Sequence, residues 1–373
     1  MKKILFVASV VKLHINVFHI PTFKLLKEMG YEIHVAAKND YVPKGDMKID
    51  FCDYFHEVSF ERSPFKKDNL EAFKELEKIM LDGDFDIVHC HTPIGGALTR
   101  FVKMKNPNIK SEIIYTAHGF HFYKGAPIKN WIIFYPIEKF LSRYTDKLIT
   151  INEEDYNYSK KMHAKENIYV PGVGIDLDKF IVSSPTEIER KRKELNIPEN
   201  NLVLLSIGEL SERKNHKVVI ETLSNFSTEN ITYIICGQGP LRDELEDLVE
   251  QYNLTKQVLL LGFRNDINEI CNVADIFVFP SIHEGLPVSV MEAMASRLPV
   301  IGSRIRGNID LIDQDKGGYL GENTPNFYYE SVLKYMNNPV LAKNHGKYNF
   351  KKIQNYSINK IVETMRNVYS KKF

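Results

Sequence analysis

The sequence predicts an α/β fold of two successive Rossmann-like domains, each built on a parallel sheet with helices on both faces. Its length of 373 residues suggests two domains of roughly 150–200 residues each. Short apolar runs alternate with helical patterns along almost the whole chain, as is typical of strand–helix–strand units. Proline, glycine and charged residues interrupt this pattern over Val170–Lys193, which we interpret as the interdomain connection.

Each predicted element is a periodic segment that ends where the pattern changes. In the first half, apolar runs predict strands over 3–10, 32–37, 85–90, 112–116 and 147–151, and helical spacing predicts helices over 18–29, 69–81, 94–104 and 129–143. In the second half, the expected strands are 201–207, 231–236, 258–261, 275–279 and 299–302, and the expected helices are 216–223, 241–251, 267–272 and 288–296. Helical patterns fill the C-terminal tail.

These elements give domains over residues 1–172 and 173–355, followed by a helix over 356–373 that we expect to pack back on the first domain. Open parallel sheets bind ligands beyond the carboxyl ends of their strands. Two such edges that face each other would form a deep interdomain cleft.

Composition and charge exclude several classes of protein. A formal net charge of +1 gives no bulk attraction for nucleic acid, and no run of about 18 apolar residues predicts a transmembrane helix. The start, MKKILFVASVVKLHI, has a short strand-like apolar run without a small-residue cleavage site, so we expect no signal peptide. The scattered cysteines, Cys52, Cys90, Cys236 and Cys271, indicate reduced thiols of a cytoplasmic protein.

The most informative stretch is PSIHEGLPVSVMEAMAS at residues 280–296, which joins a strand to a helix. Glu284 stands in a Gly- and Pro-marked turn, and Glu292 follows eight positions later on the helix. A helix N-terminus favours an anion, so the unit suits a nucleotide diphosphate with a carboxylate at each end for hydroxyl groups. The alternative is an ordinary strand–turn–helix whose glutamates face water.

Other strand-end turns in the second half have the same character. After Gly208, Arg213 and Lys214 stand just before a helix, where cations oppose the helix dipole unless a bound anion offsets them. The alternative is a solvated basic loop. Cys236–Pro240 is a Gly-x-Gly-Pro helix entry, weak evidence alone because glycine is common in tight turns. The loop with Phe263 and Arg264 is placed to meet a base ring.

Taken together, these segments resemble glycosyltransferase family 4, whose members have the two-domain GT-B fold. The second half matches with GEL-x-x-RKNH at 208–216, CGQGP at 236–240, LGF at 261–263, PS-x-x-EGLP-x-x-x-x-EAMA at 280–295 and PVIGSRIRGNIDLI at 299–312. In the first half, IVHCHTP at 87–93, YTAHGFHFYKGAP-x-KNW at 115–131, ITINEEDY at 149–156 and VGIDLDKF at 173–180 are similar to bacterial exopolysaccharide and capsule enzymes. The resemblance covers nearly the whole chain.

The resemblance implies roles for particular residues. In the family an Arg/Lys pair binds the donor diphosphate, which implies that role for Arg213 and Lys214. Glu284 is expected at the hydroxyls of the donor sugar and Glu292 at the ribose. His118 matches the N-domain histidine near the transferred sugar, and with Arg213, Lys214 and Glu284 it forms the expected catalytic set. The other expected donor contacts lie in the same turns: Gly208, Glu209, Gly237, Phe263, Arg264, Gly285, Leu286, Pro287 and Val288.

Two departures from the family pattern stand out. Many members have arginine where this chain has Glu209, so the diphosphate would depend on Arg213 and Lys214 alone. Many members also have a Gly-Gly loop after the first strand, where this chain has the run from Ala8 to His14. The pattern His14-x-x-x-Phe18-His19 is instead similar to the exopolysaccharide subgroup.

Nine of the twelve histidines fall in the first half of the chain. A zinc site is one interpretation of this enrichment, but the spacing along the sequence fits no tetrahedral pattern well. We favour polar groups that line an acceptor pocket, and we expect His14, His19, His91 and Thr92 on the acceptor side. The Asp-x-Asp pairs at 84–86 and 176–178 are not placed to meet a diphosphate in the second domain, so we expect no metal dependence and no cofactor.

The segment Phe120–Arg143 is rich in aromatic residues interleaved with Lys124, Lys129, Lys139 and Arg143, and it contains the only tryptophan, Trp131. A basic aromatic helix suits a membrane interface. We therefore hypothesise peripheral contact with the inner leaflet. The alternative is a helix packed in the core of the first domain.

The sequence thus predicts a retaining, metal-independent glycosyltransferase. We expect it to move a hexose or N-acetylhexosamine from a UDP-sugar to a polyprenyl-diphosphate-linked saccharide in capsule or exopolysaccharide synthesis. One rival is a non-hydrolysing sugar-nucleotide epimerase, against which the EGLP-to-EAMA segment argues. Another is a non-catalytic sugar-binding protein, which would usually be exported. A nicotinamide dehydrogenase is disfavoured, because no Gly-x-Gly-x-x-Gly follows the first strand.

Overall fold

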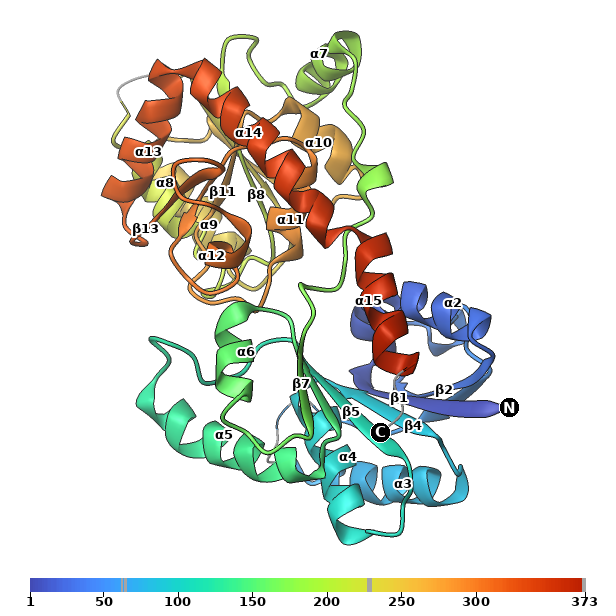
Figure 1. Cartoon of the computed structure of the whole chain (residues 1–373). Coiled ribbons are helices and arrows are strands. Elements are labelled where there is room, and N and C mark those ends of the chain that lie inside the picture. Colours follow the sequence, from blue (N-terminus) through green and yellow to red (C-terminus); the bar gives the residue numbers. More distant parts are fainter. Residues whose placement is uncertain (62, 64–65, 227–229, 371–373) are drawn as a thin grey trace. The chain divides into compact units, whose positions relative to one another are not determined.

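The chain forms two compact α/β units, seen in the computed structural model of Figure 1. The structure describes residues 1–61, 63, 66–226 and 230–370. Unit 1 comprises residues 1–174 and 358–373, and unit 2 comprises residues 175–357. Each unit has one parallel sheet, of seven strands in unit 1 and six in unit 2, so the predicted fold class is confirmed.

Unit 1 is a doubly wound sheet with the strand order β3-β2-β1-β4-β5-β6-β7. Every neighbouring pair is parallel. Its strands are β1 (Lys2–Val10), β2 (Tyr31–Lys38), β3 (Tyr54–Glu57), β4 (Ile87–His91), β5 (Glu112–Ala117), β6 (Lys147–Thr150) and β7 (Glu166–Tyr169). Its helical segments before residue 174 are η1 (Val11–Ile15), α1 (Asn16–Phe18), α2 (Ile20–Glu28), η2 (Lys44–Asp46), α3 (Asp68–Asp82), α4 (Pro93–Lys105), α5 (Ile128–Leu141), η3 (Ser142–Tyr144) and α6 (Glu153–Ser159).

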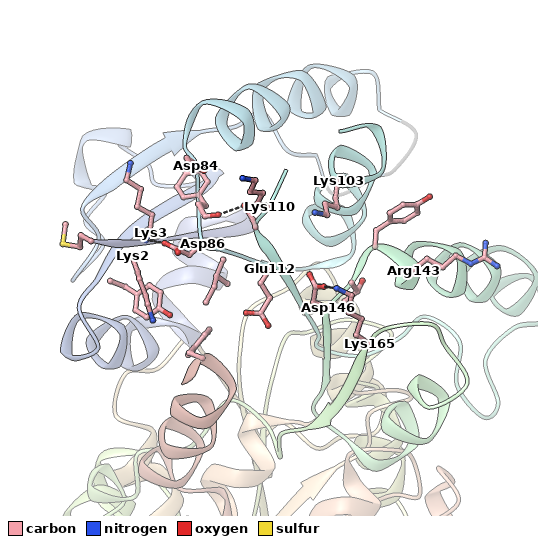
Figure 2. Close-up of a pocket in the computed structure, with 18 residues that line it drawn as sticks. Lys2, Lys3, Asp84, Asp86, Lys103, Lys110, Glu112, Arg143, Asp146 and Lys165 are labelled. Carbon is pink, nitrogen blue, oxygen red and sulfur yellow. Dashed lines mark hydrogen bonds and ion pairs between the residues drawn. The ribbon is translucent and has the colours of Figure 1, made fainter. Parts of the chain in front are cut away.

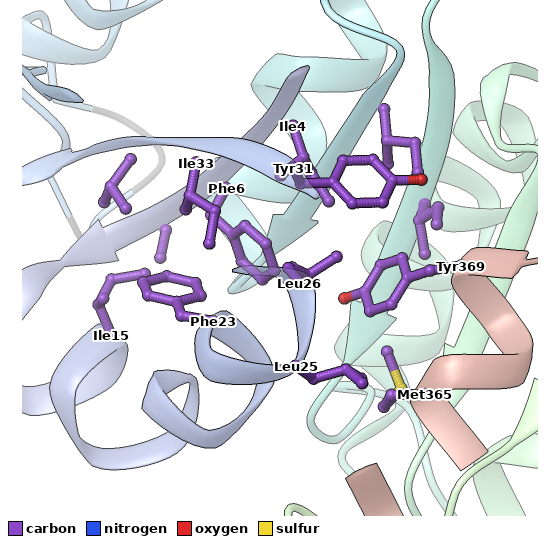
Figure 3. Close-up of a cluster of buried hydrophobic side chains, with 14 of the residues drawn as sticks. Ile4, Phe6, Ile15, Phe23, Leu25, Leu26, Tyr31, Ile33, Met365 and Tyr369 are labelled. Atoms are coloured by element: carbon purple, nitrogen blue, oxygen red, sulfur yellow. The ribbon is translucent and has the colours of Figure 1, made fainter. Parts of the chain in front are cut away.

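The core of unit 1 follows from the apolar character of both faces of β1. Because side chains alternate along a strand, Ile4 and Phe6 join one cluster while Leu5 and Val7 join the other. The first cluster is completed by α15 (Ile358–Ser370) from the far end of the chain. Figure 3 shows Met365 and Tyr369 of this helix beside Leu25 and Leu26.

Polar contacts fasten α15 as well. The Nζ atom of buried Lys147 donates to the backbone oxygen of Val368 at 2.7 Å. The Tyr369 hydroxyl lies 2.7 Å from Nδ1 of His89, and both groups are buried. These partners satisfy groups that would otherwise be costly to remove from water.

Unit 2 repeats the architecture with the order β10-β9-β8-β11-β12-β13, again parallel throughout. Its strands are β8 (Leu202–Ile207), β9 (Ile231–Cys236), β10 (Val258–Gly262), β11 (Ile276–Phe279), β12 (Val300–Ser303) and β13 (Gly318–Gly321). Its helical segments are η4 (Leu177–Lys179), α7 (Pro185–Glu194), α8 (Lys217–Leu223), α9 (Arg242–Gln251), α10 (Ile267–Val273), α11 (Val288–Ala295), α12 (Asn308–Leu311), α13 (Pro325–Asn337), α14 (Pro339–Ile353) and η5 (Gln354–Tyr356).

Several elements were absent from the sequence prediction. Strands β3, β7 and β13 are only four residues long and lack a continuous apolar run. Helix α6 begins at Asn152, whose side chain accepts a bond from the Asp155 backbone. Helix α7 lies inside the segment interpreted as a connection, and the Ser184–Glu187 capping box starts it. Within the described residues, no helix is long and apolar enough to cross a membrane.

Candidate functional site

Three strand-end turns meet at the carboxyl edge of the unit 2 sheet. The Gly208 backbone N–H donates to the Cys236 oxygen at 2.9 Å, and the Leu210 N–H donates to the Gln238 oxygen at 3.0 Å. A Cβ atom on Gly237 would lie 1.8 Å from the Gly208 oxygen, so only glycine permits this approach. The Ile282 N–H donates to the Arg213 oxygen at 2.8 Å, which ties the third turn to the first.

The predicted basic pair and the first glutamate form the centre of this site. The Lys214 ammonium lies 2.8 Å from Oε1 of Glu284, and the Arg213 guanidinium bonds the same oxygen. Lys214 is buried over the Phe279 ring, 4.6 Å from its centroid, and burial lowers the pKa of the ammonium. Two cations thus converge on one carboxylate, and together they can also face an anionic ligand. Glu209 is exposed, and its negative charge acts to raise the pKa of Lys214, whereas burial lowers it.

The turn of Glu284 is held by an arginine that the sequence analysis did not single out. Nε of Arg306 donates to the Glu284 backbone oxygen at 2.8 Å. Gly307, with φ of 77°, packs so closely that a Cβ there would lie 2.5 Å from the Gly285 oxygen. Gly285, Leu286 and Pro287 lead into α11, which begins at Val288 without a side-chain cap. Its first N–H groups and the dipole therefore suit an anion. The sequence IRGN, an arginine and a glycine shortly after β12, could have indicated Arg306 as a residue of a strand-end turn.

Glu292 lies on α11 and differs sharply from Glu284. It is half-buried, and burial raises the pKa of its carboxyl group to about 7. A carboxyl group with this pKa is close to half-ionised at neutral pH. Hydroxyl donors from a ligand would favour its charged form.

The loop after β10 presents one exposed and one fixed side chain. The Phe263 ring is 69% exposed, enough for a flat ligand ring to stack on it. Nε of Arg264 instead bonds Oδ1 of Asp266 at 2.7 Å. Nζ of Lys191, on α7, bonds Oδ2 of Asp266 at 2.7 Å. In this structure Phe263 is exposed, whereas Arg264 is paired with Asp266.

The histidines predicted on the acceptor side gather with His118 at the carboxyl edge of the unit 1 sheet. His91 ends β4, His118 follows β5, His14 lies in the π-helical turn η1, and His19 precedes α2. Nε2 atoms of His14 and His19 are 3.2 Å apart, and Nδ1 of His91 is 3.3 Å from Nε2 of His118. The spacing along the sequence fits no tetrahedral pattern well, but the fold brings the four rings together, because residues spread along the sequence share one strand edge.

All four of these imidazoles are held neutral. Burial lowers the pKa of His14 to about 2 and that of His118 to about 4, and it lowers those of His19 and His91 well below the usual value. Neutral rings offer lone pairs as well as N–H groups, so this edge suits hydroxyl groups or a soft cation.

Thr92 occupies a strained position beside this cluster. Its φ of 61° and ψ of 153° lie in a region that β-branched residues rarely adopt. Its hydroxyl shares a 2.8 Å hydrogen bond with the Ser9 hydroxyl, which helps to hold the turn between β4 and α4. His89, two residues before His91 on β4, packs against it with ring centroids 4.1 Å apart, and it also hydrogen-bonds Thr116 and Tyr369.

Two cavities in the surface are not lined by the site residues predicted from the sequence. One, of about 720 Å³, lies at the amino-terminal edge of the unit 1 sheet and mixes lysines with carboxylates such as Asp86 and Glu112 (Figure 2). Parallel sheets bind ligands at the opposite edge. The other, of about 730 Å³, lies beyond β11–β13 of unit 2, lined by Asn215, Ser281 and Arg304 among others, next to the Glu284 turn.

Helix α5 has two different faces. Trp131, Phe134 and Tyr135 pack against the second core cluster of unit 1. The opposite face exposes five large apolar side chains: Ile128, Ile132, Ile133, Ile137 and Phe140. One side of this helix therefore packs in the core of unit 1, and the other side is an exposed apolar surface.

Two parallel α/β units, with charged strand-end turns in the second, are the architecture of GT-B glycosyltransferases, and the comparisons with known proteins identify that class. Family models match both halves: "Glycosyl transferase 4-like" over residues 3–152 and "Glycosyl transferases group 1" over residues 187–352. The chain belongs to glycosyltransferase family 4 and is a glycosyltransferase. It is 36% identical to the putative glycosyltransferase EpsD of Bacillus subtilis, over 99% of this chain and 96% of that protein.

Other similarities agree. The chain is 28% identical, over 93% of its length and 91% of the relative's, to a UDP-Gal:alpha-D-GlcNAc-diphosphoundecaprenol alpha-1,3-galactosyltransferase of Escherichia coli. Among solved structures, Anabaena HepE with UDP and glucose superposes with a TM-score of 0.82 at 17% identity, covering 99% of this chain and 100% of that one. At this identity the likeness supports the fold alone.

Proposed function

We propose that this enzyme transfers a hexose or N-acetylhexosamine, with retention at the anomeric carbon, from a UDP-sugar to a polyprenyl-diphosphate-linked saccharide in exopolysaccharide or capsule synthesis. The observation that carries the proposal is the convergence of Arg213 and Lys214 on Glu284 beside the uncapped start of α11. The name of the Escherichia coli relative, which states a UDP-galactose donor and a lipid-diphosphate acceptor, supports both substrate classes.

The donor site follows from the charges. Breaking the bond between sugar and diphosphate leaves negative charge on the phosphate, and fixed cations and N–H groups stabilise that charge. Arg213, Lys214 and the first N–H groups of α11, near Gly285 and Val288, supply them. When a diphosphate takes up these cations, the Glu284 carboxylate becomes available to the sugar hydroxyls.

The nucleoside has its own contacts in the proposal. Glu292 accepts hydrogen bonds from the ribose hydroxyls, and the exposed Phe263 ring stacks on the uracil. Gly208 and Gly237 allow the backbone to approach the phosphates. The Arg264–Asp266 pair keeps the loop in place rather than contacting the base.

The acceptor side belongs to unit 1. His118 hydrogen-bonds near the transferred sugar, and His14, His19, His91 and Thr92 line the pocket for the acceptor. The exposed isoleucines of α5 provide an apolar surface for the inner leaflet, and Lys129 and Lys139 on the same helix attract anionic headgroups. This arrangement brings the enzyme to a lipid-linked substrate.

A donor screen tests the proposal. We expect calorimetry with UDP- and GDP-sugars to show micromolar binding of one UDP-sugar, with slow hydrolysis that retains the anomeric configuration. Lys214→Ala removes this binding, whereas Lys217→Ala, an exposed lysine at the start of α8, leaves it unchanged. Preference for a GDP-sugar, or equal binding by Lys214→Ala, would contradict the donor assignment.

A further inference from the structure

The four histidines at the carboxyl edge of the unit 1 sheet form a compact nitrogen cluster. One ring nitrogen from each of His14, His19, His91 and His118 lies within 4.8 Å of the other three. The four come from three loops that follow β1, β4 and β5. We propose that this cluster binds one divalent transition-metal ion of the zinc class.

The spacing fits tetrahedral coordination. Zinc–nitrogen bonds of about 2.0–2.1 Å place two ligand nitrogens about 3.3–3.4 Å apart across one edge of a tetrahedron. The Nε2 atoms of His14 and His19 are 3.2 Å apart. The widest pair, at no more than 4.8 Å, has to close by about 1.5 Å, which rotation of the side chains can supply.

An unpaired nitrogen points to a ligand. Nε2 of His91 is buried and has no hydrogen-bond partner among the residues that the structure describes. Buried polar atoms are usually paired, so such an atom calls for an explanation. Coordination to a metal ion would use its lone pair.

The ligand types select the metal. The cluster contains imidazoles without any carboxylate, and imidazole suits zinc, copper, nickel and iron, whereas magnesium and calcium prefer oxygen.

The surroundings hold the rings in place. The Phe6 ring lies nearly parallel to His91, with centroids 5.6 Å apart, and packs against His19 at 5.7 Å. The His19 and His91 centroids are only 4.0 Å apart. A cavity of about 40 Å³, lined in part by His19, His91 and His118, leaves room for a water-sized ligand. A packed support of this kind is what a metal site needs.

The first experiment needs no variant. Tag-free protein is treated with a chelator, dialysed, and titrated with Zn²⁺ and Co²⁺ by calorimetry and visible absorption. We expect one ion per chain and the intense d–d bands of tetrahedral Co²⁺, with no binding of Mg²⁺. Absence of stoichiometric Zn²⁺ and Co²⁺ binding would overturn the proposal, and donor binding in the same sample shows whether the protein is otherwise competent.

The second experiment locates the ion. We expect His19→Ala and His91→Asn each to weaken Zn²⁺ binding at least about a hundredfold, since each removes a ligand. The control is His56→Gln, because His34 and His56 also form a pair, 2.9 Å apart, but without further histidines. Circular dichroism confirms folding, and His14→Gln replaces any variant that unfolds. Zn²⁺ affinity that survives all ligand substitutions, or that falls equally in His56→Gln, would place the ion elsewhere.

Discussion

The candidate sites of the two units lie at the same place in the fold but consist of different kinds of side chain. In unit 2, Arg213 and Lys214 converge on one carboxylate, so the site is a set of fixed charges. In unit 1, the four clustered histidines are neutral, and burial keeps them so. Both lie beyond the carboxyl ends of parallel strands. The comparison teaches that the fold sets the location of a site, while a few side chains set the kind of ligand that it accepts.

The largest expected effect comes from breaking the charged site. We expect Lys214→Ala and Glu284→Ala each to lower kcat/KM by about a hundredfold or more, because the leaving diphosphate and the sugar hydroxyls lose their partners. Steady-state kinetics with the UDP-sugar identified in the screen measures this loss. Thermal unfolding and Lys217→Ala serve as controls; retained activity in both variants would refute the site assignment.

The neutral site predicts a different kinetic signature. In chelator-treated protein, which holds no ion at the histidine cluster, we expect His118→Ala to lower kcat/KM by about ten- to a hundredfold while UDP affinity stays unchanged. One hydrogen bond to the sugar is then lost, and the proposed nucleotide site lies in unit 2. Paired kinetics and UDP calorimetry check this. An equal loss of UDP affinity would mean that His118 acts on the nucleotide instead.

The pH dependence of UDP binding tests the difference between Glu284 and Glu292. Burial raises the pKa of Glu292 to about 7, and ribose hydroxyls bind the ionised form. Binding therefore releases a proton near neutral pH, and affinity should rise about tenfold from pH 6 to pH 8. Calorimetry in buffers of different ionisation enthalpy measures both quantities. In Glu292→Gln, the part of this rise in UDP affinity that comes from Glu292 should disappear. If the affinity of the variant changes with pH as in the unmodified enzyme, the dependence comes from ionisation of the phosphate.

The smallest expected effect is on the surface of unit 1. We expect Ile132→Glu with Ile137→Glu to abolish flotation with anionic phospholipid vesicles, while stability and donor hydrolysis change little, because both side chains are exposed. Val340→Glu on α14 is the matched control, since Val340 is about as exposed as Ile132. If the double variant and Val340→Glu float with the vesicles equally well, the membrane role of α5 is refuted.

Much of the fold could be predicted because long apolar strands and helices carry strong periodic signals. β1 and β8 lie close to their expected bounds. β3, β7 and β13 could not be predicted, since four partly polar residues carry no periodicity. These short strands form through pairing with neighbours, which is tertiary information.

The two sites differed in how far the sequence disclosed them. Arg213, Lys214 and Glu284 stood out because turn glycines and helix starts mark each of their loops. His14, His19, His91 and His118 were also predicted as site residues, but their contact with one another was not. His14 and His118 come from loops after different strands, and only the strand order β1-β4-β5 makes those loops neighbours. Arg306 and Asp266, which brace the donor loops, also depend on such contacts.

Helix α15 has a consequence for the order in which the protein forms during synthesis. Ile361, Met365, Val368 and Tyr369 complete a core whose other members mostly precede residue 171. The ribosome therefore synthesises all of unit 2 before the first unit can close. We expect a purified chain truncated after residue 357 to hold a protease-resistant unit 2 and a protease-sensitive unit 1. The part of the enzyme that is made first would be the part that finishes folding last.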